Sequence, residues 1–148
     1  MTLVHPPLTG FPFALLTCAV ICEAMSLLSN SAPWVSRRRL FFYAACIATP
    51  ATYLSGYVGS EYANQSFTVS DEAIAAHQSA ALFFVFSLYS ALLLDLISRV
   101  RNAPVLLQIS RLALILSFSL CIWTSLQGGQ LVFSQGAAVN LTQELDQE

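Results

Sequence analysis

The stretch of residues 71–101 sets the strongest limit on how this chain can fold. It reads DEAIAAHQSAALFFVFSLYSALLLDLISRVR, and between residues 73 and 98 it is mostly apolar, with one histidine near its start and one aspartate near its end. At 1.5 Å per residue, a helix of this length crosses a hydrocarbon layer of about 30 Å. The apolar residues of this helix would lie all around its circumference and not on one side only. This pattern favours lipid and neighbouring helices as its environment. The stretch therefore predicts a membrane-spanning helix.

The composition of the whole chain has the same character. Of its 148 residues, 56% are hydrophobic and only 9% are charged, and the mean hydropathy is +0.66. A soluble domain usually has about 25% charged residues to cover its surface. We therefore expect residues 1–148 to form a single all-α integral membrane domain in contact with the lipid bilayer. No basic stripe with interleaved aromatic residues is present, so nucleic-acid binding is not expected.

Four apolar segments are separated by residues typical of turns. The breaks are NSAP at residues 30–33, a polar and acidic loop at 59–71, and NAP at 102–104. A further apolar segment, residues 129–139, is too short to span the bilayer and is expected at the interface. The predicted spanning helices cover residues 11–29, 40–58, 73–98 and 105–126.

All six basic residues are arginines, and they lie around only two of the connections. Residues 37–39 fall in the predicted loop between the first two helices, and Arg99, Arg101 and Arg111 flank the turn between the last two. The positive-inside rule then puts both termini outside. In a bacterium, this describes a multi-pass protein of the inner (cytoplasmic) membrane with periplasmic termini.

A shift of 72 residues aligns the chain with itself. Apolar matches carry little weight in a membrane protein, but polar residues and glycines match as well. The interval from histidine to acid is 18 residues in both halves. We therefore predict a four-helix bundle of two parallel-repeat helix hairpins, related by a pseudo-two-fold axis along the membrane normal. The informative matches are His5 with His77, Glu23 with Asp95, Arg39 with Arg111, and Gly56 with Gly128.

The two histidines of the repeat are the only ones in the chain, and the repeat puts them at similar depth near the outer face. Two such imidazoles can ligate one b-type haem inside a helix bundle. Glycines let a macrocycle approach the backbone closely. This interpretation predicts a small redox-associated subunit that transfers electrons between other membrane redox subunits and a periplasmic carrier. Its cofactor-binding residues would be His5, His77, Gly56, Gly128, Tyr57 and Gln127.

Other interpretations of the same residues remain open. His5 can be an interfacial residue, and His77 a polar residue near a helix start that bonds to a neighbour. A copper site with only these two ligands would lack donors. The alternative function is a cofactor-free accessory subunit of a larger membrane complex. No catalytic arrangement is present, so we expect no enzymatic activity of its own, and the four cysteines, all in apolar segments, are interpreted as small buried hydrophobes.

Glu23 and Asp95 are acids within predicted helices, at a cost of about 2.5–3.5 kcal/mol each if they lie at the bilayer centre. Both fall toward the arginine side. Symmetric structural ion pairs with Arg39 and Arg111 are therefore preferred over a proton path or a transporter.

Several motifs resemble a known family. The opening HPPLTGFPFALL is similar to HPxxxHFPIALL, the close GGQLVFSQGAAV is similar to GGxLVYxxGxxV, and SGYVGSEY and AAHQSAAL resemble the middle of the same family. This is a bacterial group of small four-helix predicted membrane proteins, known as a domain of unknown function, and the likeness covers residues 5–139. It implies the same fold and the company of redox proteins, without a settled activity. The second opening histidine of the family falls on Gly10 here, and Gln135 stands where some members have histidine.

Overall fold

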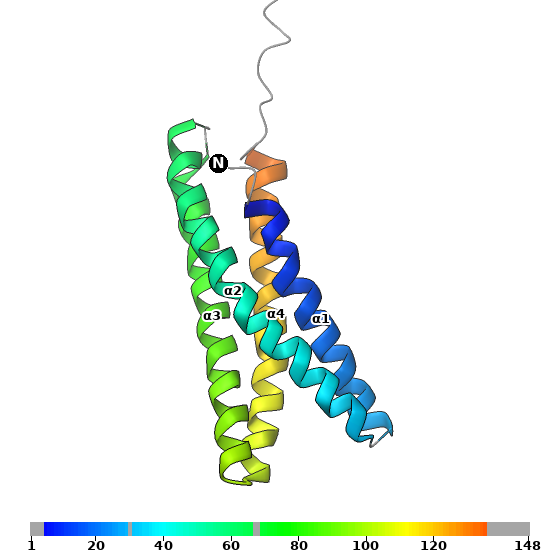
Figure 1. Ribbon diagram of the computed structural model, residues 1–148. Helices are drawn as coiled ribbons and strands as arrows, with labels where there is room; N and C mark the ends of the chain where they lie inside the picture. The colour runs from blue at the N-terminus through cyan, green and yellow to red at the C-terminus, as the bar shows by residue number, and fades with distance from the viewer. Residues whose placement is uncertain (1–4, 30, 67–68, 136–148) are drawn as a thin grey trace, which may run out of the picture.

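A computed structural model describes residues 5–29, 31–66 and 69–135, and the prediction of an all-α four-helix arrangement is confirmed (Figure 1). Its helices form two hairpins, and the turns of both hairpins are at the same end of the molecule, the turn end. The opposite end, where α1 begins at His5, is the histidine end. The helices are α1 (His5–Ser29), α2 (Ala32–Ser66), α3 (Asp71–Val100) and α4 (Pro104–Gln135).

Each helix is longer than the apolar segment that predicted it. The arginines at 37–39 lie within α2 and not in a loop, and α2 continues to Ser66 through residues expected to be a polar loop. α4 runs through Gly128 and Gly129 to Gln135, so residues 129–135 are not a separate interfacial segment. Residues 136–139 lie outside the described residues. Hydropathy marks only the part of a helix suited to hydrocarbon, whereas arginine and glutamate are good helix formers that extend it.

Local signals set the two ends of α3. The Ser70 side chain accepts a hydrogen bond from the Ala73 amide, and two acids follow in the first turn, where the helix dipole favours them. At the other end Asn102 has a φ of 49°, a conformation that asparagine tolerates well. The Ala103 amide then donates to the Ser98 carbonyl at 2.9 Å, which is a Schellman motif. Pro104 starts α4 directly afterwards, so the turn is short.

The two hairpins contribute equivalent residues to the core. Packing is most extensive within the hairpins, α1 with α2 and α3 with α4, and the hairpins meet through α1 with α4 and α2 with α3. Fully buried residues recur at the 72-residue interval, as in Leu16 with Leu88 and Phe42 with Leu114. Ser26 donates to the Glu23 carbonyl at 2.8 Å, and Ser98 donates to the Asp95 carbonyl at 2.7 Å.

In the part of the chain that the structure describes, three helices are long and apolar enough to cross a membrane, over Leu8–Ser29, Asp71–Val100 and Pro104–Ser134. The helix α2 is not among them, because its middle contains Pro50 together with threonines and tyrosines that lower its hydropathy. By helix length and hydropathy the chain is a multi-pass membrane protein whose outer surface contacts lipid.

Candidate functional site

The His5 imidazole is hydrogen-bonded to a serine of α2, and this serine is bonded in turn to the backbone of its own helix. Its Nδ1 lies 2.9 Å from Ser55 Oγ, and Ser55 Oγ donates its only hydrogen to the Thr52 carbonyl at 2.7 Å. The serine oxygen must therefore accept from His5, which puts the imidazole proton on Nδ1. The lone pair is then on Nε2, as required of a histidine that binds a metal through that atom.

Each histidine ring lies against a glycine of its own hairpin. A Cβ atom added at Gly56 would be 2.7 Å from His5 Cε1, and one added at Gly128 would be 3.1 Å from His77 Cε1. Both distances are shorter than ordinary van der Waals contact, so an alanine at either position would displace the ring. In this structure the group that approaches each glycine is therefore an imidazole.

The second hairpin contains an incomplete version of the His5–Ser55 pair. His77 Nδ1 and Gln127 Oε1 are both buried, and neither has a hydrogen-bond partner among the described residues. The backbone of Thr124 is near the His77 ring, but it does not reach hydrogen-bond geometry at Nδ1. Gln127 follows Ser55 by 72 residues, so the two side chains are equivalent in the repeat.

The two imidazoles lie at the same end of the bundle, His5 in the first turn of α1 and His77 in the second turn of α3. Burial lowers the pKa of His5, and this effect exceeds the opposite effect of the Thr52 backbone. His5 is therefore neutral at pH 7, the form that binds a metal. Tyr57, another residue predicted for this site, has 59% of its surface exposed and lies on the outside of α2.

A bare metal ion has little support at the histidine end. Within residues 5–29, 31–66 and 69–135, no three histidine, cysteine, aspartate or glutamate side chains come together as ligands. The four cysteines are free, and three of them are buried. Any metal held by His5 and His77 would need its remaining ligands from elsewhere.

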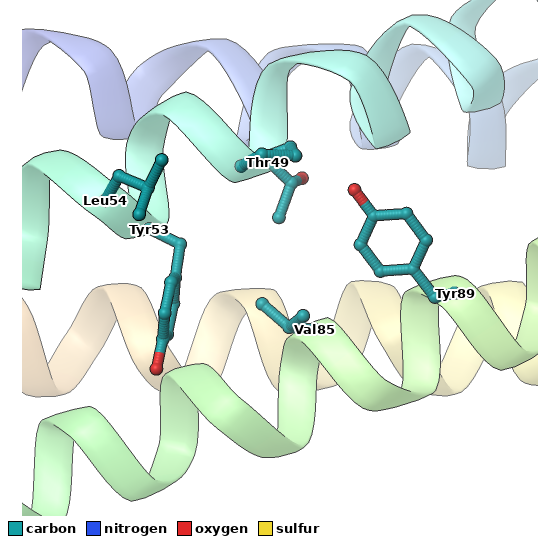
Figure 2. Close-up of a pocket in the computed structure, with 6 residues that line it drawn as sticks. Thr49, Tyr53, Leu54, Val85 and Tyr89 are labelled. Carbon is teal, nitrogen blue, oxygen red and sulfur yellow. The ribbon is translucent and has the colours of Figure 1, made fainter.

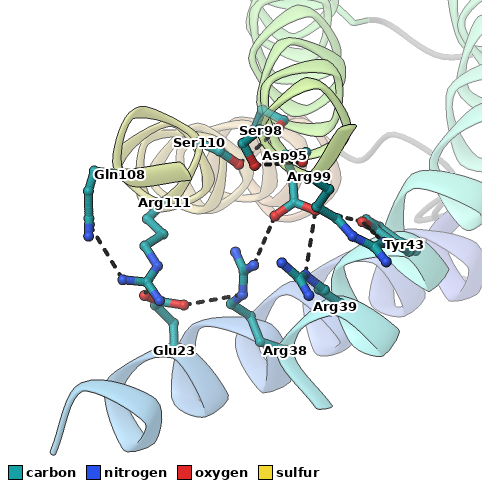
Figure 3. Close-up of polar contacts among 11 residues, drawn as sticks. Glu23, Arg38, Arg39, Tyr43, Asp95, Ser98, Arg99, Gln108, Ser110 and Arg111 are labelled. Atoms are coloured by element: carbon teal, nitrogen blue, oxygen red, sulfur yellow. Dashed lines mark hydrogen bonds and ion pairs between the residues drawn. The ribbon is translucent and has the colours of Figure 1, made fainter. Parts of the chain in front are cut away.

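The turn end contains a buried arginine that joins the two hairpins. The Arg38 side chain is 0% exposed, and it lies between the two intramembrane acids (Figure 3). Its Nε is 3.2 Å from Glu23 Oε2, and its Nη2 donates to Asp95 Oδ1 at 2.9 Å. Arg38 thus connects α1 with α3 from its place on α2. Sequence reasoning did not single out Arg38, because its equivalent at the 72-residue interval is Ser110.

The other predicted ion-pair residues surround Arg38. Arg111 Nε lies 3.0 Å from Glu23 Oε1, and Arg39 Nε lies 3.7 Å from Asp95 Oδ2. Each acid therefore pairs with an arginine of the other hairpin. Two more groups join: the Tyr43 hydroxyl donates to Asp95 Oδ2 at 2.6 Å, and Arg99 donates to the Tyr43 hydroxyl at 3.3 Å.

A shallow apolar hollow of about 250 Å³ lies between α2 and α3 beside Pro50 (Figure 2). A proline at position 50 removes the amide that would bond to the Cys46 carbonyl one turn earlier. The Tyr89 hydroxyl, which points from α3 toward α2, donates to this carbonyl at 2.8 Å. The tyrosine therefore satisfies a backbone group that would otherwise be unpaired in a low-dielectric region. The lining residues are Thr49, Pro50, Tyr53, Leu54, Val85 and Tyr89.

Comparison with known proteins identifies no family: no family model, no curated protein and no solved structure matches the chain. The family resemblance of the sequence motifs is not supported by these comparisons. The arrangement of four helices, three of them both long and apolar enough to cross a membrane, is what the structure supports.

Replacing Arg38 by methionine tests the buried network. Arg38→Met removes the charge shared by Glu23 and Asp95, and removing one partner from a buried ion pair typically costs about 3–5 kcal/mol. We expect a decrease of this size in the free energy of unfolding, measured in detergent micelles by circular dichroism. The control is Arg37→Met, because Arg37 is exposed and stacks on Trp34. Equal losses in the two variants would contradict the central role of Arg38.

The glycine contacts give a second prediction, with adjacent residues as test and control. Alanine in a helix is favoured over glycine by about 0.5–1 kcal/mol, and a Cβ added at Gly129 would have none of the described residues within 4 Å. We therefore expect Gly129→Ala to raise the melting temperature slightly. Gly128→Ala and Gly56→Ala should lower it, because each must displace a histidine ring. A gain in all three variants would show that the rings move without cost.

Proposed function

We propose that the protein binds one b-type haem between His5 and His77 and acts as a small electron-transfer subunit of a membrane redox system. One observation carries the proposal. Two imidazoles that are equivalent in the repeat lie at the same end of the bundle, each against a glycine of its own hairpin. The proton on His5 Nδ1 leaves Nε2 available to a metal.

The number of ligands favours haem over a bare ion. A porphyrin supplies four nitrogen ligands, so two histidines complete the coordination of its iron. Bound haem would supply a one-electron redox centre. The protein would contribute neutral imidazoles, and Ser55 would fix the orientation of the His5 ring through Nδ1.

Gln127 has the corresponding role for His77 in this proposal. Its Oε1 and His77 Nδ1 are both buried and lack partners among the described residues, so a hydrogen bond between them would satisfy both. Such a bond would put the His77 proton on Nδ1 and give its Nε2 the same availability as that of His5. The symmetry of the two ligands would then be complete.

We propose further that all four helices span the membrane. Three exposed apolar residues of α2, Leu40, Ile47 and Leu54, are 65%, 79% and 63% exposed and recur every seven residues. This spacing gives α2 one apolar outer face that suits lipid. All six arginines lie toward the turn end, so the positive-inside rule puts this end in the cytoplasm. The termini and histidines would then face the periplasm of a bacterium, where a soluble carrier or other redox subunits could exchange electrons with the haem.

Haem binding is tested by absorption spectroscopy of the full chain, purified in detergent from cells supplied with a haem precursor. We expect a Soret band and, after reduction, the sharp α-band of a low-spin bis-histidine haem. His5→Ala and His77→Ala should each abolish the low-spin spectrum. Gln127→Ala should retain haem less tightly than wild type.

The matched control for the histidine variants is Ser79→Ala on α3, because Ser79 is exposed and its hydroxyl bonds to the Ala75 carbonyl of its own helix. This variant should keep the wild-type spectrum. A wild-type protein without a Soret band, or a band unchanged in His77→Ala, would refute haem ligation. A colourless protein that copurifies with a larger membrane complex would favour the accessory-subunit function instead.

The topology is tested with single cysteines in a variant that lacks the four native ones. Cysteines at Ala32, the first residue of α2, and at Asn102 in the α3–α4 turn should react with a membrane-impermeant thiol reagent only after the cells are opened. A cysteine at Ser70, before α3, should react in intact cells. Labelling of Ser70 and Ala32 from the same side would mean that α2 does not cross the bilayer.

A further inference from the structure

A second hollow lies at the turn end, where the α3–α4 turn meets α2. It has a volume of about 420 Å³ and both polar and apolar walls. Two arginines line it, Arg39 from α2 and Arg99 from α3, and no acidic residue is among its lining residues. The other lining residues are Ser98, Asn102, Ala103, Pro104 and Leu107.

The positive charge of these arginines is incompletely balanced by protein groups. Asp95 already accepts from Arg38 at 2.9 Å and from Tyr43 at 2.6 Å, and its contact with Arg39 is longer, at 3.7 Å. Arg99 is exposed and bonds to a neutral hydroxyl. The turn end as a whole has six arginines and two carboxylates, Glu23 and Asp95. An anion in the hollow would therefore meet an excess of positive charge.

The backbone around the hollow also favours an anion. Pro104 begins α4 at the edge of the hollow, and Ala103, just before it, has no side-chain acceptor that could cap the helix. The first amides of α4 therefore present the positive end of the helix dipole. The negative end of α3 is close by, but the carbonyls of Ile97 and Ser98 are already bonded to the amides of Arg101 and Ala103.

Exposed apolar side chains flank the arginines and indicate the source of the anion. Leu40 follows Arg39 and is 65% exposed, and Val100 and Val105, on either side of the turn, are 84% and 69% exposed. A free phosphate would not use these side chains, whereas the acyl chains of a phospholipid would cover them. We propose that the hollow binds the phosphate of an anionic phospholipid between Arg39, Arg99 and the start of α4. Basic pockets between membrane helices bind lipid head groups in this way.

The proposal does not depend on haem, and it is tested with the full chain in a zwitterionic detergent. Phosphatidylglycerol, phosphatidylcholine and inorganic phosphate are titrated separately, and binding is followed by the rise in melting temperature and by native mass spectrometry. We expect saturable binding of phosphatidylglycerol alone. Arg99→Gln should weaken this binding by at least about tenfold, because it removes charge-assisted hydrogen bonds to the phosphate. Arg99→Lys, which keeps the charge without the planar fork, should fall between Arg99→Gln and wild type.

The matched control is Arg101→Gln, which removes the same charge from an exposed residue two positions away that does not line the hollow. Loss of diffuse attraction alone should weaken binding there by about fivefold or less. Equal losses in Arg99→Gln and Arg101→Gln would overturn the site in favour of a non-specific basic surface. Equal protection by inorganic phosphate would overturn the lipid as its ligand. The melting temperature of Arg99→Gln without lipid is compared with that of wild type. If Arg99→Gln is unstable, the lipid affinity of Arg99→Lys is used to test the site instead.

Discussion

The buried charge of Arg38 is the constraint on which the association of the two hairpins depends. Helices in a membrane gain little from hydrophobic burial against each other, so polar contacts and close packing decide which surfaces pair. Most packing in this protein is within the hairpins. Arg38, from the first hairpin, bonds to Glu23 of its own hairpin and to Asp95 of the other, so a relative shift of the hairpins would leave charges unpaired. Because desolvation of these charged groups offsets much of their mutual attraction, the network contributes mainly by specifying one arrangement of the hairpins.

Sequence reasoning predicted the acids and outer arginines of this network, because they recur at the 72-residue interval. It missed Arg38 because a comparison of repeats finds what two halves share, and Arg38 is matched by Ser110. Another signal was present. Phe42, Ala45 and Thr49, all buried, follow Arg38 at helical spacings of four, seven and eleven residues, so Arg38 belongs to the inward face of α2. The helix ends were mispredicted for a different reason, since hydropathy reports the thickness of the hydrocarbon layer and not the length of a helix.

At the histidine end, the repeat predicted which residues correspond but not how they touch. His5, Gly56 and their equivalents could be selected from the sequence, yet the contact of each ring with a glycine of its own hairpin needs the crossing of two helices. The Ser55–Gln127 equivalence was also hidden, because a hydroxyl and an amide do not look alike in an alignment. Both side chains offer an oxygen that can accept from an imidazole Nδ1, which is the property that matters for a histidine ligand. Tyr57, another residue predicted for the haem site, faces outward, since successive residues on a helix point in different directions.

The two ends of the bundle differ in how far they follow the repeat, and electrostatics explains the difference. Neutral imidazoles do not repel each other, so each hairpin can keep one at the histidine end. A planar cofactor with two equivalent faces would require one imidazole from each hairpin. The other hairpin cannot contain a second buried cation at the position equivalent to Arg38 in the same way. An arginine at Ser110 would add a second buried positive charge beside Glu23 and Asp95, whose oxygens already contact three arginines and a tyrosine. No carboxylate would remain to balance it, and an unpaired buried charge costs several kcal/mol. Ser110 instead donates to the Ala91 carbonyl at 3.0 Å, which lets α4 pack closely on α3 while Arg38 alone occupies the centre of the network.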